Sequence, residues 1–252
     1  MQVPVVRALE TRLGGLTTGL YVGGSVATGD YRAGVSDIDV VALMAGTPDR
    51  ATRRLLAGTH RELVAAEPDG AALHCVYVPS DRAQDPTRRH WTWAFEELFR
   101  RPLSGIARAE LLADPVIVSG PPPATWLPAM GPDDVRGAAA AELSGYWSRV
   151  VRKPALWRQD TYVDHGTTTL ARADITIAEG RLATKREAIG RLAELGLPAD
   201  IVDGIGRRRC GERTPLTAPE TEHRAVVVRA FMRRHLARLL DDASRPSTST
   251  KE

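Results

Sequence analysis

The amino-acid sequence predicts an α+β protein: a small mixed β-sheet with flanking helices, followed by an all-α helical bundle. Short apolar runs rich in β-branched residues alternate with amphipathic stretches up to about residue 120, and no later stretch has the pattern of a strand. The segment GPPPATWLP interrupts the chain between these halves, because consecutive prolines continue neither a helix nor a central strand. We therefore expect a sheet domain at 1–120, a linker at 121–131, a helical domain at 132–241 and a disordered tail at 242–252.

The first half alternates between strand and helix patterns. Strands are predicted at 20–22, 37–44, 71–78 and 116–120. Helices are predicted at 48–67, around 91–99 and in a stretch that ends at 108–115. The glycines and serine after the first strand can open a further helix. This order favours a small sheet with helices packed on it.

The second half contains helix patterns at 133–153, 167–180, 184–195 and 220–242. Gly180 stands where a helix C-cap is expected. The sequence TKRE is a capping box, with Thr184 as the N-cap and Glu187 three residues later. The helix that begins there places positive partial charge, together with Lys185, at its N-terminus.

Composition excludes several classes of protein. The 252 residues carry a formal net charge of +3 with acids interspersed, so we interpret the Arg207–Arg209 cluster as a solvated helix face and expect no nucleic-acid partner. Two cysteines make no disulfide framework. No apolar run reaches the length of about 18 residues that a membrane span needs. We expect a cytoplasmic monomer.

Two aspartates separated by one residue are the strongest sign of chemistry. Asp37 and Asp39 lie on one face of a predicted strand, where their charges repel unless a cation lies between them. Carboxylates suit Mg²⁺, which also takes water and substrate phosphates as ligands. Upstream, Gly24 and Ser25 offer backbone amides and a hydroxyl to a phosphate. Together these residues indicate a site for a metal and a phosphorylated substrate.

The Gly-Ser pair followed by Asp-x-Asp resembles the signature of the nucleotidyltransferase superfamily related to DNA polymerase β. The resemblance implies that Asp37 and Asp39 bind Mg²⁺ and that Gly24 and Ser25 hold the triphosphate. A hydroxyl of the acceptor would attack the α-phosphorus and release pyrophosphate. The metal would clamp the attacking and leaving oxygens.

The helical half is similar to that of aminoglycoside adenylyltransferases of the streptomycin/spectinomycin type. The similarity lies in TLARADITIAEGRLATKREAI, residues 169–189, with Arg172 in a helix, a glycine turn, and Lys185 opening the next helix. It implies that Arg172 and Lys185 contact the phosphates of ATP as co-substrate. It also implies a small-molecule acceptor and a role in antibiotic resistance.

The family places a glutamate on a neighbouring strand as the base toward the acceptor hydroxyl, and the strand ALHCVYV has no acidic residue. His74 stands at the matching position and can itself be the base. A carboxylate can instead come from the following segment, where the candidates are Asp81, Glu96 and Glu97. Metal coordination can also make a strong base unnecessary. His74 as a space-filling residue is the structural alternative.

A polycationic acceptor requires acidic and aromatic surfaces. The candidate substrate residues are Glu97, Trp157, Asp160 and Asp164, although an aspartate before a helix is often an N-cap and a tryptophan is often core. Two other hypotheses remain open. The enzyme could modify a protein or tRNA, as toxin–antitoxin nucleotidyltransferases do, or the chain could be a catalytically silent nucleotide-binding module.

Overall fold

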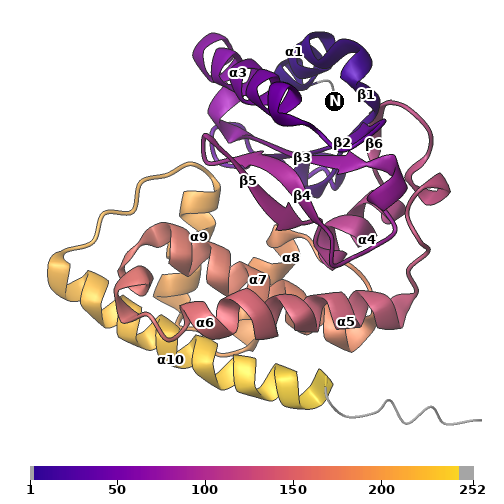
Figure 1. The fold of residues 1–252 in the computed structure, drawn as a ribbon. Helices are drawn as coiled ribbons and strands as arrows, with labels where there is room; N and C mark the ends of the chain where they lie inside the picture. The colour runs from indigo at the N-terminus through magenta and orange to yellow at the C-terminus, as the bar shows by residue number, and fades with distance from the viewer. Residues whose placement is uncertain (1–2, 244–252) are drawn as a thin grey trace, which may run out of the picture. The chain divides into compact units, whose positions relative to one another are not determined.

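The computed structural model describes residues 3–243 (Figure 1). The chain divides between Met130 and Gly131 into two compact units, called here the N-terminal unit and the C-terminal unit. Each unit is described by itself. The helices in the described range are all too short or too polar to cross a membrane.

The N-terminal unit is built on a six-stranded mixed sheet with the strand order β5-β4-β3-β2-β1-β6. Its strands are β1 Thr17–Val22, β2 Ile38–Met44, β3 Leu73–Pro79, β4 Arg89–Ala94, β5 Glu97–Pro102 and β6 Val116–Ser119. Only β2 and β3 pair in parallel, and every other neighbouring pair is antiparallel. A parallel pair needs a crossover, and α3 supplies it between β2 and β3.

Helices cover both faces of this sheet (Figure 1). They are α1 Pro4–Leu13, α2 Gly24–Ala27, α3 Arg50–Ala66 and α4 Gly105–Ala113. On one face, Leu9 of α1 and Leu56 of α3 pack against inward residues such as Leu20. On the other face, Leu111 of α4 packs near Tyr21. The sheet is therefore buried on both sides, and the mixed sheet with flanking helices predicted from the sequence is confirmed.

The helix predicted around residues 91–99 is wrong, because this stretch forms the β4–β5 hairpin. Trp91 and Trp93 alternate with smaller side chains, and both pack toward the covered face with α3. The two turn residues, Phe95 and Glu96, both have positive φ angles, of 54° and 59°. Such turns normally contain Asn, Asp or Gly, so the sequence gives no turn signal here.

The C-terminal unit is helical, and the described residues after β6 contain no strand. Its helices are α5 Pro132–Glu142, a π-helical turn Leu143–Trp147, α6 Ser148–Val150, α7 Asp160–Glu179, α8 Lys185–Glu194, α9 Ala199–Arg209 and α10 Ala218–Ala243. The helical half predicted from the sequence is thus confirmed, although α7 begins at Asp160 rather than at 167.

Both predicted helix caps in the C-terminal unit are confirmed. Gly180 ends α7 with a φ of 69°, the left-handed conformation that favours glycine. Thr184 and Glu187 form the reciprocal hydrogen bonds of a capping box at the start of α8. The predicted tail at 242–252 starts too early, since α10 continues to Ala243, and the rest of it lies outside the described residues.

Candidate active site

Strand β2 positions the two aspartates. Asp37 immediately precedes the strand, and Asp39 is its second residue. Both are exposed, while Ile38 between them is fully buried. This alternation places the two carboxylates on one face, as the spacing predicts. Asp39 is paired in register with His74 of the parallel strand β3, so their side chains also share a face.

The glycine turn after β1 lies directly against Asp39. The amide of Gly23 donates to the backbone carbonyl of Asp39 at 2.9 Å. Gly24 has a φ of +57°, and a Cβ at this residue would lie 2.5 Å from Asp39 Oδ2. Glycine is therefore required twice, for the backbone conformation and for the close approach. Ser25 follows as the second residue of the short helix α2. The fold brings Gly24, Ser25 and Asp39 together.

The donor set suits Mg²⁺ that shares its ligands with a substrate. Asp37 and Asp39 form no ion pair within the described chain. Residues 3–243 also contain no cluster of three or more His, Cys, Asp or Glu side chains that could hold a metal ion. Mg²⁺ is commonly held by one or two carboxylates, with water and phosphate oxygens completing its shell. A pair of carboxylates beside a glycine turn fits this pattern.

His74 is the residue nearest in register to Asp39 that can accept a proton. Its side chain is largely buried, and its ring makes an edge-to-face contact with Phe95 at 4.9 Å between centroids. A buried neighbour, His60, has a pKa lowered to about 3, first by burial and then by the charge of His74. Only His74 of the two lies on the face that carries Asp39.

The alternative carboxylates lie farther from Asp39. Asp81 follows the opposite end of β3, about 20 Å along the strand from His74. Glu97 lies opposite Ala94 on β5, two strands beyond β3, which corresponds to about 10 Å between backbones. Glu96 is exposed in the hairpin turn. The register therefore places Asp81 and Glu97 farther from Asp39 than His74 is.

Two residues near the site lie in the β4–β5 hairpin, which the sequence did not predict. Arg101 of β5 is half-buried, and burial lowers its pKa while the charges of Asp39 and Asp37 raise it. Its guanidinium thus acts electrostatically on both carboxylates and can also hold phosphate oxygens. Phe95 exposes 74% of its surface beside His74. The alternation in RHWTWA, typical of a strand, is the signal that could have located this hairpin.

The C-terminal unit brings Arg172 and Lys185 to one region. The Arg172 Nε donates to the carbonyl of Ala183 at 2.6 Å, so this side chain reaches the loop that leads into α8. Lys185 is the first residue of α8, directly after the Thr184 cap. Both side chains are half-buried. The local geometry is that of a cationic helix N-terminus with a second cation beside it.

The candidate substrate residues of this unit have structural partners. Trp157 is fully buried beside Trp147, and its ring lies where a Cβ on Gly166 would be. Core packing, the structural interpretation of this tryptophan, is what the fold shows. Asp160 is not an N-cap but the first residue of α7, and it pairs with Arg224.

Asp164 also has a structural partner, since both of its carboxylate oxygens accept hydrogen bonds from Arg208, at 2.6 and 2.8 Å. Burial raises the pKa of the Asp164 carboxyl, and the contact with Arg208 offsets part of this effect. Asp160 and Asp164 thus both have a charge partner inside the unit.

Comparison with known proteins defines the class. Residues 5–82 match the family model described as nucleotidyltransferase domain, and this range contains Gly24, Ser25, Asp37, Asp39 and His74. The N-terminal unit therefore carries a nucleotidyltransferase domain, and the chain is an enzyme of this type. The curated proteins include no significant sequence match.

The fold of the whole chain is similar to that of a solved adenylyltransferase. This is the spectinomycin adenyltransferase AAD(9) from Enterococcus faecialis, whose crystal structure contains ATP and spectinomycin. The match has a TM-score of 0.70 and covers 91% of this chain and 98% of the other, at 14% sequence identity. At this identity the likeness establishes a shared fold.

Proposed function

We propose that this enzyme transfers AMP from ATP to a hydroxyl group of an aminoglycoside-type antibiotic in a Mg²⁺-dependent reaction. The observation that carries the proposal is the pair of exposed aspartates that lies against a glycine turn and has no ion-pair partner in the described chain. The similar fold of a protein solved with ATP and spectinomycin supports the choice of nucleotide and acceptor.

The residues of the N-terminal unit would divide the work of the reaction. Asp37 and Asp39 would hold Mg²⁺, which neutralises charge that develops on the phosphate oxygens. The amides at Gly24 and the hydroxyl of Ser25 would orient the triphosphate. Arg101 would add a positive charge on the same side as the aspartates. By resemblance to the family, Arg172 and Lys185 would contact the phosphates from the C-terminal unit.

His74 would accept the proton of the acceptor hydroxyl. The hydroxyl oxygen forms a bond to the α-phosphorus, the bond from that phosphorus to the bridging oxygen breaks, and pyrophosphate leaves. The proton passes to a ring nitrogen of His74, whose position beside Asp39 is set by the parallel β2–β3 register. Of the predicted acceptor contacts, Glu97 would contact the acceptor, whereas Asp160 and Asp164 already bind Arg224 and Arg208.

A matrix of nucleotides and acceptors tests the proposal. Pyrophosphate release would be measured with ATP, CTP, GTP or UTP, each with Mg²⁺ and with spectinomycin, streptomycin, bulk tRNA or a protein mixture. We expect release with ATP and an aminoglycoside, and a gain of one AMP moiety in the mass of the drug. AMP on tRNA or protein alone would instead identify the alternative acceptor. ATP binding without any turnover would indicate a silent module.

Substitution of His74 tests whether this residue is the base that replaces the missing glutamate. His74→Ala should lower kcat by about 10²- to 10⁴-fold with little change in ATP affinity. His74→Glu, which restores the residue of the family, should recover much of the rate and shift the acidic limb of the pH profile. A wild-type rate and pH profile for His74→Ala would show that no base is needed at this position.

A further inference from the structure

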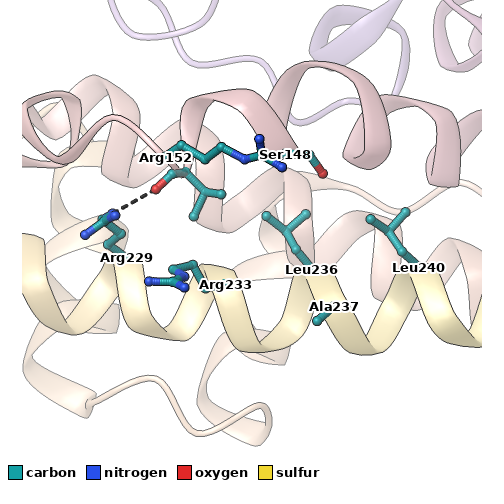
Figure 2. Close-up of a pocket in the computed structure, with 8 residues that line it drawn as sticks. Ser148, Arg152, Arg229, Arg233, Leu236, Ala237 and Leu240 are labelled. Carbon is teal, nitrogen blue, oxygen red and sulfur yellow. Dashed lines mark hydrogen bonds between the residues drawn. The ribbon is translucent and has the colours of Figure 1, made fainter.

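A pocket lies within the C-terminal unit, between the turn that follows α6 and the long helix α10 (Figure 2). Its volume is about 390 Å³, which falls in the range of small-molecule sites. The lining consists of three arginines, one serine and four apolar residues: Arg152, Arg229, Arg233, Ser148, Val151, Leu236, Ala237 and Leu240. None of these residues belongs to the proposed catalytic machinery.

The spacing on α10 gives this pocket a cationic end and an apolar end. Arg229, Arg233, Leu236 and Leu240 follow one another at intervals of three or four residues, so they lie on one stripe of the helix. Figure 2 shows Arg229 and Arg233 toward one end and Leu240 at the other. From Arg229 to Leu240 the helix rises about 16 Å. A ligand that spans the pocket would contact arginine side chains at one end and leucine side chains at the other.

The three arginines lack the counter-ions that eight other arginines of this unit have. None of them forms an ion pair within the described residues, and no carboxylate lines the pocket. In contrast, eight arginines of the same unit are paired with acids: Arg136, Arg158, Arg181, Arg191, Arg207, Arg208, Arg224 and Arg238. The pocket is therefore a local excess of positive charge that an anion would balance.

Local backbone features fix two walls of the pocket. The Arg229 Nε donates to the carbonyl of Val151 at 2.8 Å, which ties α10 to the turn after α6. The π-helical turn Leu143–Trp147 directly precedes Ser148, whose hydroxyl donates to the Leu143 carbonyl at 2.9 Å. Single π-turns inside helices are frequent at functional sites. This one directly precedes the segment that contributes Ser148, Val151 and Arg152 to the pocket lining.

We propose that this pocket binds a small amphiphilic anion, a phosphate or carboxylate group joined to an aliphatic chain. The guanidinium groups of Arg229 and Arg233 bind the anionic head through charge-assisted hydrogen bonds, and Arg152, whose guanidinium lies beside Ser148, adds positive charge to the pocket. Leu236, Ala237 and Leu240 cover the chain, and its burial favours binding. A free phosphate or a nucleotide has no aliphatic chain to bury at the apolar end.

Calorimetric titration of the full chain tests this assignment. The probes are decyl phosphate and decanoate below their micelle concentrations, with inorganic phosphate and decanol as the head alone and the tail alone. We expect the two amphiphiles to bind and the separate halves to bind far more weakly. Arg152→Gln combined with Arg233→Gln should weaken binding by about tenfold or more. Arg234→Gln, which makes the same change on α10 outside the pocket lining, should leave it unchanged.

A separate substitution tests the apolar end of the pocket. Ala237→Phe fills the pocket and leaves all three arginines in place, so it should weaken decyl phosphate but not inorganic phosphate. Circular dichroism establishes that each variant is folded. Equal affinity for inorganic phosphate and decyl phosphate would overturn the proposal, as would amphiphile binding that neither set of variants changes. Capture by phosphatidylglycerol vesicles without binding of the soluble probes would also overturn it, in favour of a membrane surface.

Discussion

The acidic residues of the two units have different surroundings. In the N-terminal unit, Asp37 and Asp39 are exposed, lie next to each other and form no ion pair in the described chain. In the C-terminal unit, Asp160, Asp164 and Asp174 each bind at least one arginine, and Asp174 binds both Arg191 and Arg238. These three carboxylates are thus neutralised within the protein itself.

This contrast separates structural charge from functional charge. A paired carboxylate contributes to folding and has little capacity left for a ligand. Two adjacent unpaired carboxylates repel each other, and a bound cation relieves that repulsion. The same residue type therefore has opposite roles in the two halves, and its surroundings distinguish them where a count of acidic residues cannot.

The largest effect is expected at the unpaired site. Asp39→Asn should reduce nucleotide turnover by about 10³-fold or more, because the metal loses one of its two carboxylates. Its free energy of unfolding should change by no more than about 1 kcal/mol, since the carboxylate has no partner to lose. Pyrophosphate release and urea unfolding measure the two quantities. Glu62→Gln, an exposed acid on α3 whose one ion pair, to Arg12, is long at 3.9 Å, is the control and should leave turnover unchanged and stability nearly unchanged.

The functional role of the unpaired aspartates would be contradicted if Asp39→Asn unfolded most of the protein while the fraction that stayed folded kept its turnover. Asp39 would then be a structural residue like those of the C-terminal unit.

The next effect is expected at the paired site and should have the opposite signature. Asp174 is 3% exposed, and Asp174→Asn would leave two arginines without their shared partner. We expect a loss of about 3 kcal/mol in the free energy of unfolding. Urea unfolding monitored by circular dichroism measures this loss. Asp203→Asn, an acid of the same unit for which no ion pair exists in the described chain, should be nearly neutral.

The smallest effect concerns the contact between Gly24 and Asp39. Gly24→Ala and Gly29→Ala both place alanine at a positive φ, of +57° and +68°, so each should lose about 1–2 kcal/mol of stability. Only the Cβ at residue 24 meets a neighbour within 4 Å, namely Asp39. Gly24→Ala should therefore also lower turnover by about tenfold, through displacement of the carboxylate. Equal turnover in the two variants would show that this contact has no role in catalysis.

Much of the site could be predicted from the sequence because it depends on local patterns. The strand that carries Asp39, the glycine turn and the strand that carries His74 each follow from apolar runs with β-branched residues or turn signals. The caps of α7 and α8 were equally local. The helix α1, at Pro4–Leu13, lies outside the predicted elements.

The hairpin β4–β5 could not be predicted in the same way. Its turn residues are Phe95 and Glu96, which carry no turn signal, and Glu96 and Glu97 favour a helix by propensity. Pairing with β3 overrides that local preference. Because the assignment failed here, Arg101 was not recognised as a neighbour of the aspartates. Partners such as Arg208 for Asp164 are 44 residues away in sequence, so no local pattern reveals them.

The parallel pairing of β2 and β3 also affects how this protein folds. Asp39 and His74 are neighbours only after the chain between them has formed α3 and returned to the sheet, which is a non-local step. Partly folded chains would therefore lack the assembled site. Mg²⁺ with ATP should bind the native state alone, raise its melting temperature in proportion to the logarithm of ligand concentration, and slow unfolding without accelerating the early folding steps.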